Sequence, residues 1–192
     1  MPVIACVLLA DCGSGALDFS APLTVFDNFH AIEPGRAYRS AQLDSESLRL
    51  VIGALGIRTV VNLRGRNETA PWYRNERAVT EAAGVALVDI KMHPDILPSR
   101  EALLLLYDTF TTAEHPILIH CWMGADRTGA AAAIWRMVVR GDPRGVAAAE
   151  LSPLYGHLES THPAMDHLVR IFQPDREWIE TEYGVPQHER GV

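Results

Sequence analysis

Apolar residues in this chain of 192 residues fall into short continuous runs and into stretches with helical spacing. The continuous runs at residues 57–63, 85–90 and 117–120 have the length and β-branched content of buried strands. Between the runs, apolar positions recur every three or four residues, as in residues 48–55, which predicts amphipathic helices. Strands that alternate with helices along a chain predict an α/β fold with a mostly parallel sheet.

Turn and capping residues mark the limits of these elements. Pro71 begins one predicted helix, and Gly56 and Gly84 each end one. The turn sequence Glu33-Pro34-Gly35 joins two short strands between residues 26 and 38. The predicted helices occupy residues 44–55, 71–83, 98–110, 128–140, 144–151, 164–172 and 176–183. We therefore expect a central, mostly parallel sheet of four to five strands with helices on both faces.

The chain is long enough for one domain with a sizeable core. We expect that domain at residues 26–183, preceded by a loose segment at 1–25 and followed by a tail at 184–192. The segment 1–10 is apolar but too short to span a membrane. Residues 8–13 faintly resemble a lipoprotein cleavage site at Cys12, although no Lys or Arg precedes them and Asp11 replaces the expected small residue.

Two interpretations of this N-terminal segment stay open. It is either the remnant of an export or anchor segment whose start lies upstream, or the first strand of a cytoplasmic enzyme. The compartment is therefore not predicted, and membrane association would depend on this segment.

Charge and cysteine content narrow the function. A net charge of −7 argues against a nucleic-acid partner, because proteins that bind nucleic acids usually have a basic face. It does not argue against an anionic substrate, because the local field at a site can oppose the global charge. None of the three cysteines forms a Cys-x2-Cys pair, so we expect no structural zinc. His157, His162 and His167 recur every five residues, which is not a helix-face repeat, and we expect surface or loop histidines and no metal or other cofactor.

Arginines and aromatic residues crowd the first half of the chain. Arginines such as Arg39 and Arg64 are expected mostly at the solvated surface, with some of them at the border of the active site as the alternative. Trp72 and Tyr73 are expected to anchor the helix 71–83 to the core, with stacking against a substrate ring as the alternative.

The segment with the clearest chemistry is residues 120–129, His-Cys-Trp-Met-Gly-Ala-Asp-Arg-Thr-Gly. A strand leads into it and an alanine-rich helix leads out, which places the loop N–H groups at a helix N-terminus, where an anion is favoured. The same field favours a thiolate at Cys121, the proposed nucleophile. Arg127 offers two parallel donors to phosphoryl oxygens, a geometry that lysine lacks.

The remaining loop residues have supporting roles. Gly124 permits a tight turn, and the Thr128 hydroxyl can donate to the sulfur. Substrate binding, mainly through main-chain N–H groups, is expected from the loop and its flanks, at His120, Trp122, Met123, Gly124, Ala125 and Gly129.

This loop resembles that of the cysteine-dependent protein tyrosine and dual-specificity phosphatases. Residues 38–43 and 56–64 are similar to the first strands of compact bacterial dual-specificity-like phosphatases, and the resemblance runs from about Asn28 to about Phe172. It implies a cysteinyl-phosphate intermediate, formed at Cys121 and hydrolysed by water without a metal ion.

The general acid has two candidates. In many relatives an Asp on a separate loop after an earlier strand protonates the leaving oxygen, and Asp95 stands in the equivalent region between two prolines. Some relatives carry an Asp just before the loop arginine, as Asp126 does here, and in part of that group this Asp supplies the proton. Asp89 lies inside a predicted strand and is less suited. The choice between Asp126 and Asp95 stays open.

We expect a phosphomonoesterase acting on phosphotyrosine, with phosphoserine and phosphothreonine as further substrates. The partner is then a phosphorylated protein or a small phosphomonoester. An inositol phosphate or phosphoinositide substrate is the alternative, favoured by Asp126, whereas the apolar Trp122 and Met123 favour an aryl phosphate.

Overall fold

The computed structural model describes residues 27–184, in which five strands form one sheet in the order β1-β2-β5-β3-β4. The strands are β1 (His30–Glu33), β2 (Ala37–Ser40), β3 (Thr59–Asn62), β4 (Ala86–Asp89) and β5 (Ile117–His120). Only β1 runs antiparallel, to its neighbour β2. The predicted mostly parallel sheet is therefore confirmed, with β5 in its centre.

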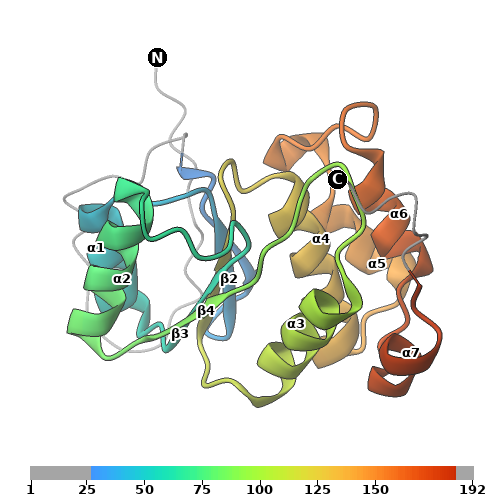
Figure 1. Cartoon of the computed structure of the whole chain (residues 1–192), viewed down its shortest axis with the longest axis horizontal. Helices are drawn as coiled ribbons and strands as arrows, with labels where there is room; N and C mark the ends of the chain where they lie inside the picture. The colour runs from blue at the N-terminus through green and yellow to red at the C-terminus, as the bar shows by residue number, and fades with distance from the viewer. Residues whose placement is uncertain (1–26, 185–192) are drawn as a thin grey trace.

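Helices cover both faces of this sheet (Figure 1). On one face α1 (Ser45–Leu55) and α2 (Pro71–Ala83) pack on alternate strand residues, including Val60 and Leu118. The residues between these, such as Val61 and Ile117, face the opposite core. That second core contains α3 (Arg100–Thr112), α4 (Asp126–Trp135), α6 (Pro163–Ile171) and α7 (Arg176–Thr181).

The predicted caps end the helices as expected. Asp44 accepts a hydrogen bond from the N–H of Ser47 at the start of α1, and this bond holds the pKa of the Asp44 carboxyl below its usual range. Gly56 and Gly84 follow α1 and α2 with φ of 64° and 65°. Each cap therefore satisfies main-chain groups that the helix itself cannot pair.

The helix behind the cysteine loop differs from the prediction. It begins at Asp126 rather than Thr128, and beyond Trp135 it continues as the π-helical turn η2 (Arg136–Arg140). The predicted helix 144–151 is split into α5 (Arg144–Ala147) and the 3-10 turn η3 (Ala148–Glu150), and a second such turn, η4 (Pro153–Tyr155), follows. Residues 128–135 are all buried, so α4 lies inside the protein between the sheet and the C-terminal helices.

The expectations for residues 1–25, with Cys12 among them, lie outside the described residues, as does the tail from 185 onward. The proposed domain limits stay predictions. Within residues 27–184, no helix has both the length and the apolar character that crossing a bilayer requires.

Candidate active site

The cysteine loop connects the central strand β5 to the buried helix α4. Gly124 turns the loop with φ of 70°, and a Cβ atom at this position would lie 2.6 Å from the Ala41 nitrogen and the Ser40 carbonyl carbon. Only glycine therefore lets the loop rest against the end of β2. Because parallel strands end at the same edge, residues after β2, β3 and β4 also reach this edge of the sheet.

The carbonyl groups of the loop are turned toward the surrounding protein. The Trp122 carbonyl accepts a hydrogen bond from the Gln42 N–H at 3.0 Å, and the Met123 carbonyl accepts one from Asn28 Nδ2, also at 3.0 Å. The main-chain N–H groups of residues 122–127, in contrast, donate to no acceptor within residues 27–184. A loop whose carbonyls are bonded outward and whose N–H groups stay free forms a cradle for an anion.

Arg39 holds the cysteine loop in this conformation. Its Nη2 donates to the Gly124 carbonyl at 2.8 Å, and its Nη1 donates to the main-chain oxygen and to Oε2 of Glu150, each also at 2.8 Å. Arg39 is thus not among the solvated arginines, because this guanidinium is fully buried and its charge is balanced by Glu150. Burial lowers the pKa of Arg39, while the bond to Glu150 opposes that shift.

One feature of the sequence indicated that Arg39 is buried. Arg39 lies inside a four-residue strand whose other residues are apolar or small, and an inward-pointing charge there requires a partner. The partner Glu150, which is 111 positions away, could not be identified from the sequence.

The nucleophile candidate is protected from bulk solvent. Cys121 is 2% exposed, directly after β5 and beside the free N–H groups of the loop. A negative charge at Cys121 raises the pKa of both Arg39 and Arg64, although burial lowers both more strongly. Both guanidinium groups therefore lie within electrostatic reach of the sulfur and stabilise negative charge on it.

Two further donors at the start of α4 have no partner among the described residues. Arg127 Nε and Thr128 Oγ1 are both buried, and neither forms a hydrogen bond there. Arg127 Nη1 reaches only the Met92 carbonyl, at 3.5 Å. Buried donors left unbonded cost free energy, so these groups point to a ligand that would accept from them.

His120 and Gly129 shape the site rather than line it. His120 Nδ1 lies 3.2 Å from the Cys121 carbonyl, and its Nε2 lies 2.7 Å from Glu76 Oε1 in an ion-pair contact that is not a directed hydrogen bond. The N–H of Gly129 donates to Ala125, and a Cβ atom at Gly129 would lie 2.8 Å from the Glu150 carbonyl. Gly129 therefore permits close helix packing, and its expected contact with the substrate stays a prediction.

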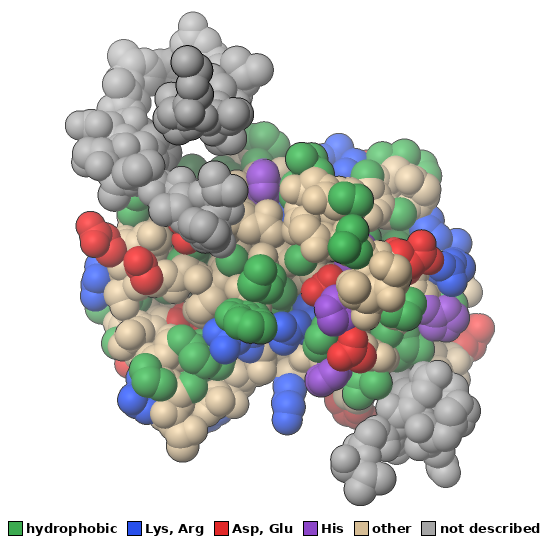
Figure 2. Space-filling model, turned by 90° about the horizontal axis from the view of Figure 1, so that it is seen from above, with side chains coloured by type: hydrophobic (Ala, Val, Ile, Leu, Met, Phe, Trp, Pro, Cys, Tyr) green, Lys and Arg blue, Asp and Glu red, His purple; other side chains and the backbone are tan. Residues whose placement is uncertain are grey.

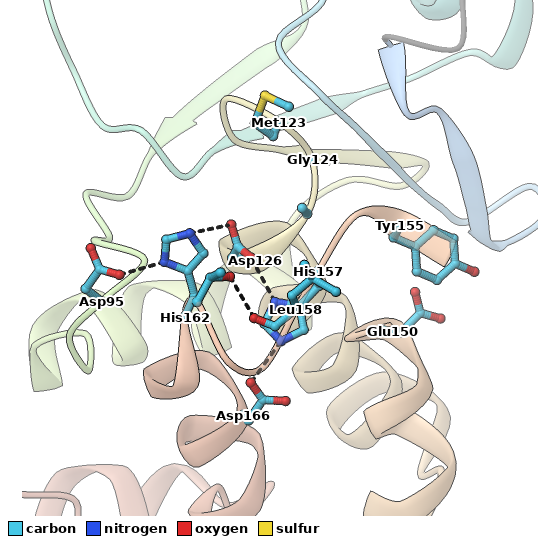
Figure 3. Close-up of polar contacts among 12 residues, drawn as sticks. Asp95, Met123, Gly124, Asp126, Glu150, Tyr155, His157, Leu158, His162 and Asp166 are labelled. Atoms are coloured by element: carbon cyan, nitrogen blue, oxygen red, sulfur yellow. Dashed lines mark hydrogen bonds and ion pairs between the residues drawn. The ribbon is translucent and has the colours of Figure 1, made fainter. Parts of the chain in front are cut away.

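The structure brings both candidate acids toward one histidine (Figure 3). Asp126 lies in the first turn of α4, whereas Asp95 is exposed in the turn after β4. His162 Nδ1 lies 2.6 Å from Asp95 Oδ1, and its Nε2 lies 3.7 Å from Asp126 Oδ2. Asp89, by contrast, is held in β4 by Asn62 and Tyr73, and burial together with this Asp89 contact raises the pKa of Tyr73 to about 12.

His157 lies in a loop, one of the two expected settings, but it is buried rather than at the surface. It is 2% exposed and lies between two carboxylates, with Nδ1 2.8 Å from Asp126 and Nε2 2.8 Å from Asp166. The regular spacing of the three histidines carried no hint of this, because His157 precedes α6 and His167 is exposed on it. Across residues 27–184, no group of three or more His, Cys, Asp or Glu side chains is placed to hold a metal ion.

Apolar and basic side chains surround the loop. Trp122 and Met123 are 64% and 60% exposed, and Leu154 and Leu158 are exposed nearby in the chain segment that carries His157. Arg64 lies over the Trp72 ring, 3.5 Å from its centre, and donates to Gln42. Seen from this side, hydrophobic side chains lie next to Lys and Arg, and His lies with Asp and Glu (Figure 2). Tyr73 anchors α2 as expected, whereas Trp72 covers Arg64 instead.

Comparison with known proteins agrees with this geometry. The family described as "DSP-PTPase phosphatase fused to NAD+ Kinase" matches residues 27–160. The dual specificity protein phosphatase TpbA of Pseudomonas aeruginosa (strain UCBPP-PA14) is 31% identical over 125 residues, which are 65% of this chain and 53% of TpbA. The chain thus spans about half the length of the curated relatives it matches.

Solved structures show the same fold. A crystal structure of P. aeruginosa TpbA in complex with pTyr aligns with a TM-score of 0.63 and 26% identity, covering 81% of this chain and 91% of TpbA. The PP-IP phosphatase SIW14 of S. cerevisiae aligns with a TM-score of 0.56 and 20% identity, covering 80% of this chain and 84% of that one, a likeness of fold alone. The family match, the loop and the fold agree: this chain belongs to the dual-specificity-type, cysteine-dependent protein tyrosine phosphatases.

Proposed function

We propose that this protein hydrolyses phosphotyrosine, and with it phosphoserine and phosphothreonine, through a cysteinyl-phosphate at Cys121. The observation that carries this proposal is the set of free N–H groups at residues 122–127 around a buried cysteine. A phosphoryl group presents several oxygens, and such donors stabilise the charge that develops on them in the transition state.

In the first step the Cys121 sulfur attacks phosphorus, and the bond from phosphorus to the leaving oxygen breaks. The loop N–H groups and the unpartnered Nε–H of Arg127 hold the phosphoryl oxygens. We assign the proton donor to Asp126, which lies one position before Arg127 and in the first turn of α4. Its carboxyl gives a proton to the leaving oxygen and becomes a carboxylate.

In the second step a water molecule attacks phosphorus and gives a proton back to the Asp126 carboxylate. The sulfur–phosphorus bond breaks, inorganic phosphate is released, and the sulfur leaves as a thiolate. The unpartnered Thr128 hydroxyl is available to donate to that sulfur, which stabilises it as attacking and as leaving group.

The exposed rim of the loop favours an aryl phosphate. Trp122 and Met123 present apolar surface beside the cradle, and aromatic rings stack well on such side chains. TpbA has been captured in complex with pTyr, which supports the same substrate class here. An inositol polyphosphate would need several more cations at this rim, where Arg64 is already committed to Gln42 and Trp72.

The test is a panel of phosphotyrosine, phosphoserine and phosphothreonine peptides with soluble inositol phosphates, assayed with the wild type and Cys121→Ser. We expect turnover to favour phosphotyrosine and to vanish in Cys121→Ser, because a serine hydroxyl stays protonated at neutral pH. The variant should still bind the phosphotyrosine peptide, measured by calorimetry. Wild-type turnover by Cys121→Ser would refute the mechanism, and faster turnover of inositol phosphates would refute the substrate class.

A further inference from the structure

Five side chains contact one another in series beside the cysteine loop (Figure 3). In order they are Asp95, His162, Asp126, His157 and Asp166. The contacts along this line measure 2.6, 3.7, 2.8 and 2.8 Å. Carboxylates and imidazoles therefore alternate along the whole length, and Asp126 occupies the middle position.

The two histidines place a proton next to Asp126. An imidazole donates from both nitrogens only when it is protonated, and otherwise one nitrogen accepts. His157 lies 2.8 Å from a carboxyl oxygen on each side, so either the imidazole is protonated or one of its two aspartates is. His157 itself is buried, whereas the side chains of its partners Asp126 and Asp166 are 16% and 19% exposed.

His162 links Asp126 to a more exposed carboxylate. Its side chain is 31% exposed and that of Asp95 is 52% exposed, whereas that of Asp126 is only 16% exposed. The charged or titratable groups on this branch come from three places: Asp126 on α4, His162 before α6, and Asp95 with its neighbour His93 after β4, 3.6 Å away. No arginine or lysine pairs with Asp95, Asp126 or Asp166 within the described part of the chain.

We propose that His162 is a positioning residue that joins Asp95 and Asp126 into one electrostatic unit. This rests on the proposed function, in which Asp126 gives its proton to the leaving oxygen. When Asp126 becomes a carboxylate, the Nε2–H of His162 faces it at 3.7 Å and compensates its charge until the attacking water returns the proton to Asp126. Asp95 contacts Nδ1 at 2.6 Å and holds the ring in this orientation. The two candidate acids are then partners rather than rivals.

The experiment compares His162→Gln with His167→Gln, which changes an exposed histidine on α6 that forms no polar contact within the described residues. Each variant is assayed from acidic to basic pH with p-nitrophenyl phosphate, a good leaving group, and phenyl phosphate, a poor one. We expect kcat of His162→Gln to fall about tenfold more for phenyl phosphate than for p-nitrophenyl phosphate, as loss of proton donation predicts. The basic limb of its pH profile should move, while His167→Gln matches the wild type.

The pair Asp95→Asn and Asp95→Asn/His162→Gln completes the test. If the residues act as one unit, the double variant loses no more than His162→Gln alone. Equal losses with both leaving groups, an unmoved pH profile or additive losses would each overturn the proposal. Asp126→Asn distinguishes the role of His162 from the role of Asp126. If Asp126→Asn loses more activity with the poor leaving group while His162→Gln behaves as the wild type, the role of His162 is refuted and Asp126 remains the acid. Urea unfolding of every variant identifies any that lose activity through misfolding.

Discussion

Replacing Arg39 should damage both the fold and the loop, and the two effects can be measured apart. Arg39→Met removes a buried charge that pairs with Glu150 and leaves the Gly124 and Glu150 carbonyls without their charged donor. Breaking a buried pair from one side costs about 3–5 kcal/mol. Arg136 lies 3.2 Å from Glu150 and compensates part of the remaining charge, so we expect the lower half of that range.

Arg39→Lys separates the charge from the shape of the side chain. Lysine keeps the positive charge but lacks the planar fork that reaches Glu150 and the Gly124 carbonyl at once. We expect a loss of unfolding free energy of about 1–3 kcal/mol, in line with one lost charged hydrogen bond. Activity should fall at least about tenfold, because an unsupported Gly124 carbonyl no longer holds the loop open.

Urea unfolding followed by tryptophan fluorescence gives the free energy, and kcat with p-nitrophenyl phosphate at a temperature well below the transition gives the activity. Glu150→Gln is the matched control, since it keeps the Arg39 bonds to both main-chain carbonyls. It should lose stability with a smaller loss of kcat. Ordinary surface substitutions change the unfolding free energy by up to about 0.5 kcal/mol. An unfolding free energy of Arg39→Met within that range of the wild type would refute the reasoning.

Three smaller changes test other parts of the site and fold. Gly124→Ala should abolish most activity and cost about 1–3 kcal/mol in urea unfolding, because its Cβ would meet the Ala41 nitrogen at 2.6 Å; unchanged kcat would contradict this. Asp44→Ala should cost about 1 kcal/mol at pH 7. The bond from Ser47 lowers the pKa of Asp44 in the folded protein. The stabilisation by Asp44 is therefore present above the ordinary Asp pKa of about 3.9 and is lost as the pH falls through the folded value. The unfolding free energies of the wild type and Asp44→Ala should then converge in acid. Trp122→Ala should raise KM for phosphotyrosine peptides and leave that for phosphoserine peptides nearly unchanged, and an equal rise in both would exclude ring stacking.

The elements were predictable because their rules are local. Asp44 and Gly56 bracket α1 through side-chain and backbone groups within a few residues, and the alternation of Val60 and Val61 between two cores follows from strand geometry alone. The loop chemistry was also local, since Cys121 and Arg127 belong to one segment. Its free N–H groups follow from the strand–loop–helix order.

The long-range polar contacts were not predictable, because their partners are distant in sequence. Asn28 binds the Met123 carbonyl from 95 positions away, and His162 reaches Asp95 across 67. The spacing of the histidines does not indicate such neighbours, so the burial of His157 was not predicted. The π-helical turn after α4 was not predicted either.

The global charge of this chain and the charge of its site have opposite signs, and the geometry explains how. The net charge is −7, yet Arg39 and Arg64 lie within electrostatic reach of the Cys121 sulfur, and Arg127 lies within reach of Arg64. Of these, Arg39 is neutralised by Glu150, whereas Arg127 has an unbonded Nε–H. One arginine thus holds the loop in shape while another stays free for the anion. A distant acidic surface is screened within about 8–10 Å at physiological salt, so the local field decides whether a phosphoryl group binds.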